Sequence, residues 1–266
     1  MEVLGYIAAI LIGISLGMIG SGGSILTVPV LVYLMHINPL VATTSSLFIV
    51  GITSLVGAFR AYSKKNVEFI AVTEFGIPSI FSIFITRHYI LPAIPAQYDV
   101  AGLHITKEML LMVVFAILML IASFSIMKNR ENVKEETRKH SLTDHKPLPL
   151  MLLGLGIGVV TGLLGAGGGF IIIPSLLFFL RLPMKTAVGT SLFIIAVNSL
   201  FGFLFSLKQF EYNWMVLILF TLLAIAGIFI GGRLSDKVSD TSLRKGFGWF
   251  VLIMAIFIIV KEMFWH

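Results

Sequence analysis

Apolar runs recur along the whole of this 266-residue chain, and they constrain its fold more than any other feature. Ten such segments are recognisable, and most approach the roughly 20 residues that a helix needs to cross a bilayer. Hydrophobic residues make up 58% of the chain and charged residues only 12%, so a soluble core of this size would lack a polar shell. The pattern predicts an all-α, multi-pass integral membrane protein.

The ten segments form two sets of five on either side of one long hydrophilic stretch. They are Val3–Gly20, Ser24–Met35, Leu40–Phe59, Phe69–Thr86, Glu108–Met127, Leu150–Leu164, Gly169–Leu180, Thr186–Leu207, Asn213–Gly231 and Leu243–Met263. A shift of 145 residues superimposes the sets without a gap, so that glycines and prolines coincide. The chain is therefore predicted to contain a first membrane repeat (1–127), a cytoplasmic linker (128–149) and a second membrane repeat (150–266).

The distribution of basic residues indicates the orientation. If each short segment doubles back to close a hairpin, fifteen of the nineteen Lys and Arg residues fall on one side of the membrane. Because basic loops stay in the cytoplasm, the linker is expected inside and both termini outside the cell (cytoplasmic) membrane. Five segments per half make the halves inverted repeats, a common plan in secondary transporters. The net charge of +6 then reflects topology, not nucleic-acid binding.

Two glycine-rich motifs, Gly20–Ser24 and Gly165–Gly169, each interrupt an apolar run. Each is followed by about 12 apolar residues, or roughly 18 Å of helix, which is too short to span the membrane. Adjacent glycines let the backbone leave the helical conformation, and irregular backbone at membrane depth must be enclosed by protein or a water-filled cavity. We expect the N-termini of two half-helices to form an anion site at the midplane. The Gly13/Gly17 and Gly158/Gly162 pairs instead have the spacing of helix-packing faces.

Polar residues lie in these breaks and at the starts of the segments that follow. Their hydroxyl groups either cap helices or contact the oxygens of a ligand, and a buried amide either joins two helices or contacts substrate. The predicted substrate-binding residues are Ser21, Gly22, Gly23, Ser24, Thr44, Ser45, Ser46, Gly167, Gly168, Gly169, Gly189, Thr190, Ser191 and Asn198.

Few charged residues fall inside the predicted segments. Glu74 is the candidate for proton or cation coupling, unless its side chain reaches water at the interface. Arg87 lies at a segment end and is interpreted, like the other basic residues there, as a topology determinant and snorkelling anchor. The chain has no cysteine, no clustered metal-ligand set and no nucleotide-binding motif. No metal, cofactor or enzymatic activity is therefore expected.

The motifs resemble the sulfite exporter TauE/SafE family of membrane transporters over essentially the whole chain. The stretches that carry the resemblance are Gly17–Ser24, Pro29 and Ala42–Phe48, with their twins Gly162–Gly169, Pro174 and Ala187–Phe193, and Gly231–Leu234. The resemblance implies a secondary transporter of small anions such as sulfite, organosulfonates or short carboxylates. An anion channel of the same fold and a membrane-embedded protein without transport activity are the alternatives. The anion, the direction of transport, the coupling ion and the oligomeric state are left open.

Overall fold

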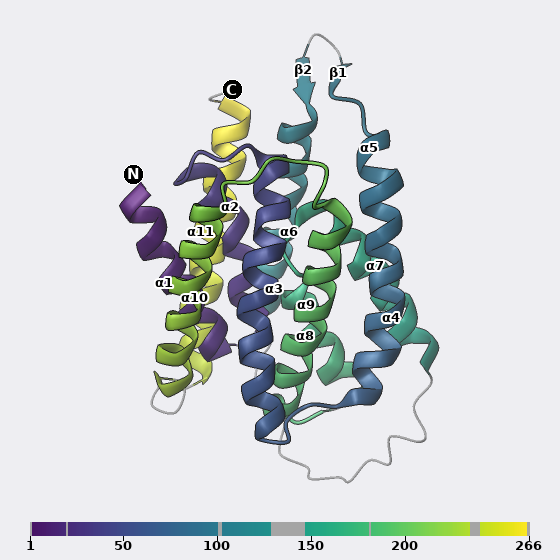
Figure 1. The fold of residues 1–266 in the computed structure, drawn as a ribbon, viewed down its shortest axis with the longest axis vertical. Helices are drawn as coiled ribbons and strands as arrows, with labels where there is room; N and C mark the ends of the chain where they lie inside the picture. Colours follow the sequence, from purple (N-terminus) through teal and green to yellow (C-terminus); the bar gives the residue numbers. More distant parts are fainter. Residues whose placement is uncertain are drawn as a thin grey trace.

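All ten predicted segments are helical in the computed structural model, which describes residues 2–19, 21–100, 103–128, 147–180, 182–234 and 240–264. Figure 1 shows the helices packed into one bundle. The first half contains α1 (Glu2–Ile19), the 3-10 turn η1 (Ser21–Leu26), α2 (Thr27–Tyr33), α3 (Pro39–Ser63), α4 (Phe69–Ile85), the π-helical turn η2 (Thr86–Ile90), α5 (Leu91–Ala93) and α6 (Lys107–Lys128). The second half contains α7 (Pro147–Leu164), α8 (Gly169–Phe179), α9 (Met184–Ser206), α10 (Trp214–Leu234) and α11 (Asp240–Phe264).

Six helices in the described ranges are long and apolar enough to cross a membrane. The prediction of a helical multi-pass membrane protein is therefore confirmed. The sequence reading missed one small feature, the antiparallel hairpin of β1 (Gln97–Val100) and β2 (Leu103–Thr106). It projects from the end of the bundle that carries both termini (Figure 1). Strands this short carry little periodic signal beside the long apolar runs.

Local sequence explains where the long helices of the first half begin. The Asn38 side chain accepts a hydrogen bond from the Leu40 backbone N–H (2.9 Å), and Pro39 occupies the first turn of α3. Proline is favoured there because its fixed φ suits a helix and its missing N–H has no helical partner to lose. Glu68 caps α4 in a similar way, by accepting from the Ile70 N–H.

The short helices belong to two hairpins that enter the bundle from opposite ends. The chain runs down α1, turns through η1 and returns along α2 to the end that carries the termini (Figure 1). The α7–α8 hairpin begins and finishes at the other end, where α9 starts (Figure 1). Each pair therefore doubles back as a hairpin instead of forming one long crossing helix. The hairpin is the arrangement that the distribution of basic residues favours.

Helices of one half pair with helices of the other half. α1 packs on α10 and α7 packs on α4, while α3 packs on α9 and α6 on α11. A Cβ on Gly13 would overlap the backbone of Ala224, and a Cβ on Gly158 would overlap that of Ser79. Gly158 lies 145 positions after Gly13, and Ala224 lies 145 positions after Ser79, so the two contacts join equivalent positions. The exchange therefore involves equivalent positions of the two halves, and the glycines act as the packing residues that their spacing predicts.

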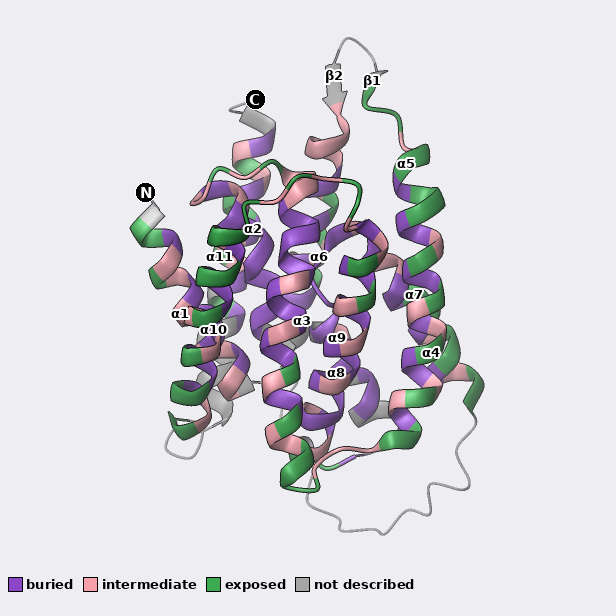
Figure 2. Cartoon of the chain, in the orientation of Figure 1, coloured by how far each residue is buried: buried purple, intermediate pink, exposed green. Residues whose placement is uncertain are grey.

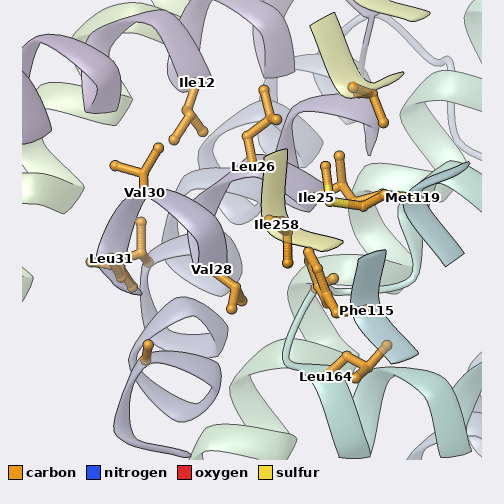
Figure 3. Close-up of a cluster of buried hydrophobic side chains, with 14 of the residues drawn as sticks. Ile12, Ile25, Leu26, Val28, Val30, Leu31, Phe115, Met119, Leu164 and Ile258 are labelled. Carbon is orange, nitrogen blue, oxygen red and sulfur yellow. The ribbon is translucent and has the colours of Figure 1, made fainter. Parts of the chain in front are cut away.

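The two most deeply buried spanning helices, α3 and α9, form the centre of the bundle (Figure 2). A hydrophobic cluster beside them joins α1, η1, α6 and α11. Figure 3 shows Ile12, Leu26, Met119 and Ile258 meeting in it. Large apolar side chains also cover the outward faces of the helices, where many are exposed (Figure 2). This distribution suits a bundle surrounded by lipid, because hydrocarbon imposes no cost on exposed apolar surface.

A candidate substrate site at the second helix break

The second break is built on left-handed backbone. Gly165, Gly167 and Gly168 have φ values of 71°, 67° and 68°, and they are the only glycines with positive φ in the part of the chain that the structure describes. Gly168 caps the start of α8. Side chains other than glycine rarely adopt this conformation because the Cβ meets the following carbonyl oxygen. The predicted departure from helical backbone at Gly167 and Gly168 is therefore confirmed.

The first break is of a different kind. Ser21–Leu26 forms a 3-10 turn, and no glycine described in it has a positive φ. A Cβ on Gly23 would lie 2.8 Å from both the Ile12 carbonyl oxygen and the Leu16 nitrogen, so this glycine allows the hairpin to close tightly on α1. The predicted break in α-helical backbone at Gly22–Gly23 is therefore present, but as a 3-10 turn without left-handed residues. Ser21 and Gly22 belong to this turn, but their side-chain surroundings lie outside the described part of the structure.

Serines of the first half hold the second break in place. Ser24 Oγ donates to the Ala166 carbonyl (2.8 Å), and Ser46 Oγ donates to the Gly165 carbonyl (2.6 Å). Gly165 also lies directly against the Thr43 backbone. The sequence-predicted residues Ser24 and Ser46 are thus brought to the second break, where their hydroxyls satisfy carbonyl groups that the broken helix leaves without helical donors.

Other hydroxyl groups around the break have no protein partner. Thr161 Oγ1 lies 2.7 Å from the position that a Cβ on Gly168 would take, and Ser199 Oγ lies 3.3 Å from the corresponding position on Gly167. Both hydroxyls, and that of Ser45 on α3, are buried and lack hydrogen-bond partners among the described residues. Buried polar groups are nearly always hydrogen-bonded, so these hydroxyls mark a place where a ligand or water belongs. Thr161 and Ser199 were not predicted from the sequence.

The hydroxyl cluster of the second half lies against a different part of the chain. Thr190 Oγ1 accepts a hydrogen bond from the Glu68 N–H (2.9 Å), and Gly189 packs against the Asn66 carbonyl. Ser191 Oγ donates back to Val188 in its own helix. The described contacts of these residues therefore join α9 to the start of α4. Gly169 is the buried first residue of α8.

Asn198 joins α9 to α4 in the interior. Its Nδ2 donates to Ser79 Oγ (2.7 Å), while its Oδ1 has no partner among the described residues. Of the two roles expected for this amide, joining two helices therefore accounts for its NH2 group. The carbonyl oxygen is an additional buried acceptor, and it suits a water molecule or a ligand that carries a proton.

The buried charges differ from those expected. Glu74, the candidate for coupling, is only half-buried on α4. A carboxylate that the sequence reading passed over, Glu262 near the end of α11, is buried and accepts a hydrogen bond from Tyr33 Oη (2.8 Å). Lys261 Nζ lies 4.4 Å from the centre of the same Tyr33 ring. Glu262 is the next-to-last residue of the predicted segment Leu243–Met263, and the sequence analysis does not single it out.

Arg87 is the clearest correction. The sequence predicts a snorkelling anchor at this position, yet the side chain is fully buried, with 0% exposure. Its Nη1 donates to Thr44 Oγ1 (2.7 Å), so a predicted site residue is in direct contact with it. The reason is that the helix does not stop at Thr86: a π-helical turn and the apolar residues Tyr89–Leu91 continue it. That apolar continuation was the available signal.

Within the described ranges, no group of three or more His, Cys, Asp or Glu residues is placed to hold a metal ion. The site therefore consists of hydroxyl groups, one amide, one guanidinium and the backbone of the glycine break. Such a set binds a ligand by hydrogen bonding and charge, and it contains no evident nucleophile with an activating base.

Comparison with known proteins agrees with this membrane architecture. Curated relatives include probable membrane transporter proteins from Xylella fastidiosa (strain Temecula1 / ATCC 700964), 27% identical and covering 95% of this chain and 92% of the relative, and from Methanocaldococcus jannaschii, 26% identical and covering 94% of each. A third, from Bacillus subtilis (strain 168), is 27% identical and covers 88% of this chain and 91% of the relative. No solved structure matches the chain. The family model described as sulfite exporter TauE/SafE matches residues 5–258, and the chain accordingly belongs to that family of membrane transporters.

Proposed function

We propose that this protein is a secondary transporter that carries a small anion across the cell membrane by alternating access around the second helix break. The observation that carries the proposal is the pair of buried hydroxyls, Thr161 and Ser199, that lie beside the left-handed glycines without partners among the described residues. Ser45 on α3 is a further buried hydroxyl of this kind. Hydroxyl groups that face left-handed glycines at membrane depth need a polar occupant, because irregular backbone there is tolerated only against protein or a water-filled cavity.

The break favours an anion over a cation or a neutral solute. α8 begins at Gly169, directly after the left-handed glycines of the break, and a helix N-terminus behaves as roughly half a positive charge. Hydroxyl donors add hydrogen bonds to the oxygens of an anion. A cation would instead need carboxylates or aromatic faces, and Glu262, the buried carboxylate of the described residues, is already bonded to Tyr33. Sulfite, an organosulfonate or a short carboxylate has the compact oxygens and low charge that fit these donors.

Alternating access would use the rigid helix pairs of the fold. The α1–α10 and α4–α7 contacts bring backbones together at glycines, so each pair can move as one body. α3 and α9 lie between these pairs and carry Ser45 and Ser199. We propose that the pairs rock about this centre, with both termini outside the cell. Any coupling to a proton would use Glu74, the half-buried carboxylate of α4.

Transport by reconstituted protein tests the proposal. Proteoliposomes should take up sulfite, methanesulfonate or acetate with saturable kinetics and show counterflow, whereas a channel would show neither. Ser199→Ala and Thr161→Val should raise the half-saturation concentration, because each removes a donor that is worth about 1 kcal/mol or more. Ser63→Ala is the matched control, since Ser63 is exposed at the end of α3 and its hydroxyl donates to the Phe59 carbonyl of the same helix. Uptake of a cation with no response to any of the anions would overturn the proposal.

A further inference from the structure

Arg87 presents an unusual arrangement of hydrogen-bond donors in the interior of the bundle. The guanidinium is buried between η2 and α3, and only Nη1 is bonded, to Thr44 Oγ1. The atoms Nε and Nη2 have no hydrogen-bond partner in the described part of the chain. These two N–H groups lie on one edge of the planar guanidinium and point in parallel, which is the geometry that accepts two oxygens of one carboxylate, sulfonate or phosphate group.

The buried charge also lacks a counter-charge. No carboxylate of the described residues pairs with Arg87, and the titratable group that interacts with its charge is the Tyr212 phenol. Tyr212 donates to the Ser206 carbonyl (2.9 Å). Burial raises the pKa of Tyr212 above its ordinary value, although Arg87 and Thr44 act in the opposite direction. The phenol therefore stays neutral near pH 7, and Arg87 keeps a whole positive charge that nothing described around it neutralises.

An uncompensated buried charge is costly, typically by several kcal/mol after relaxation. A protein that retains one without a partner in its own chain has a use for an external anion at that position. We propose that Arg87 binds a compact oxyanion through its Nε–Nη2 edge, and that Thr44 is a positioning residue that holds the guanidinium by Nη1. This inference rests on the proposed function, because the ligand that we assign to Arg87 is the transported anion.

The position of Arg87 connects it to the second break. The preceding residue, Thr86, packs directly against Gly162 near the end of α7, and the residue before Thr44, Thr43, packs against Gly165. Thr86 Oγ1 is a further buried hydroxyl without a partner among the described residues. The residues next to Arg87 and Thr44 along the chain therefore contact α7 and the start of the break.

Arg87 also supplies the charge that the glycine break lacks. A helix N-terminus contributes about half a charge, whereas the guanidinium contributes a full one and specifies two oxygens on one centre. The ligand class is therefore an anion such as sulfite, an alkyl sulfonate or a carboxylate, in preference to a halide. A lipid headgroup shares this chemistry, so anionic lipid is left out of the binding test and soluble oxyanions are the probes.

The test uses purified full-length protein in non-ionic detergent without anionic lipid, with methanesulfonate and acetate as probes. Dimethyl sulfone is the neutral control and chloride is the anion without paired oxygens. Binding constants come from calorimetry and stability from the apparent melting temperature. Wild type should bind both oxyanions and prefer them to chloride. Arg87→Lys keeps the charge but loses the two-pronged edge, so its affinity should fall about tenfold or more. Thr44→Val should weaken binding less. Arg233→Lys, at an exposed arginine of α10, should bind as wild type does.

A structural arginine and a ligand-binding arginine predict opposite changes in stability. Arg87→Met should abolish oxyanion binding, yet without ligand it should melt no lower than wild type, because replacing an unpaired buried charge by an apolar side chain removes its desolvation cost. A variant that melts lower and still binds methanesulfonate with wild-type affinity would overturn the role of Arg87 and leave the transporter proposal standing. If wild type binds no oxyanion at all, the proposed function itself fails. If the Arg87 variants do not fold, two other results would still overturn the inference. One is that wild type binds chloride as tightly as methanesulfonate, and the other is that Thr44→Val binds methanesulfonate with unchanged affinity.

Discussion

Gly168→Ala is the substitution whose effect the structure specifies most closely. At a φ of 68° a side chain costs about 1–2 kcal/mol relative to glycine. The new Cβ would also lie 2.5 Å from Ile157 Cγ2 and 2.7 Å from Thr161 Oγ1. Crowding of this kind in a packed interior costs about 1–3 kcal/mol more. We therefore expect the variant to lose about 2–5 kcal/mol of stability, which for a chain of this size lowers the melting temperature by about 4–20 °C.

The control for Gly168→Ala is Gly156→Ala, in the helix that precedes the break. A Cβ on Gly156 would meet nothing within 4 Å, and the residue is in the middle of α7. Alanine there should stabilise the helix by about 0.5–1 kcal/mol. Melting of both purified variants in one detergent, followed by tryptophan fluorescence, gives the comparison. If Gly168→Ala melts at the temperature of wild type or of Gly156→Ala, the left-handed conformation and the close contact with Thr161 cannot be as described.

Three further predictions concern topology, coupling and a buried bond. A single cysteine at Thr137, in the linker outside the described residues, should be protected from an impermeant thiol reagent in intact cells and become reactive after permeabilisation; labelling of intact cells would reverse the proposed orientation. Glu74→Gln should remove the pH dependence of transport if a proton is coupled, and an unchanged pH profile in proteoliposomes excludes Glu74 as the carrier. Tyr33→Phe removes the donor to the buried Glu262 and should cost about 1–3 kcal/mol, whereas Tyr62→Phe, at an exposed ring, should leave the melting temperature unchanged.

The sequence predicts the helical architecture well, because each element of it has a strong local signal. Apolar length sets the helices, and the matched glycines at positions such as 13 and 158 identify the faces that pack closely. Glycine at 167 and 168 also indicated the left-handed break. The same doublet at 22 and 23 has another explanation, since a 3-10 turn and close packing need glycine as much as a positive φ does. One local pattern therefore serves two different conformations, and only the tertiary contacts distinguish them.

The buried charges could not be predicted in the same way. Arg87 and Glu262 both follow long apolar runs, and a charged residue in that position usually extends to the water interface. Whether it does so depends on what surrounds it in space. Arg87 bonds to α3, and the turn that carries it packs against α7 and α9, all of which are distant from it in sequence. Whether a charged residue near a segment end is buried therefore depends on tertiary contacts. A functional role for such a residue is easy to overlook in the sequence.

The exchange of helix partners between the halves has a consequence for biosynthesis. The last residue of α1 precedes the first residue of α10 by about 200 positions, which at 5–20 residues per second takes roughly 10–40 s to translate. During that interval the glycine face of α1 has no protein to pack against, and lipid tails must cover it. Ser24 and Ser46 likewise lack their carbonyl acceptors until the Gly165–Ala166 segment has been inserted. The nascent first half therefore lacks packing and hydrogen-bond contacts that only the second half supplies.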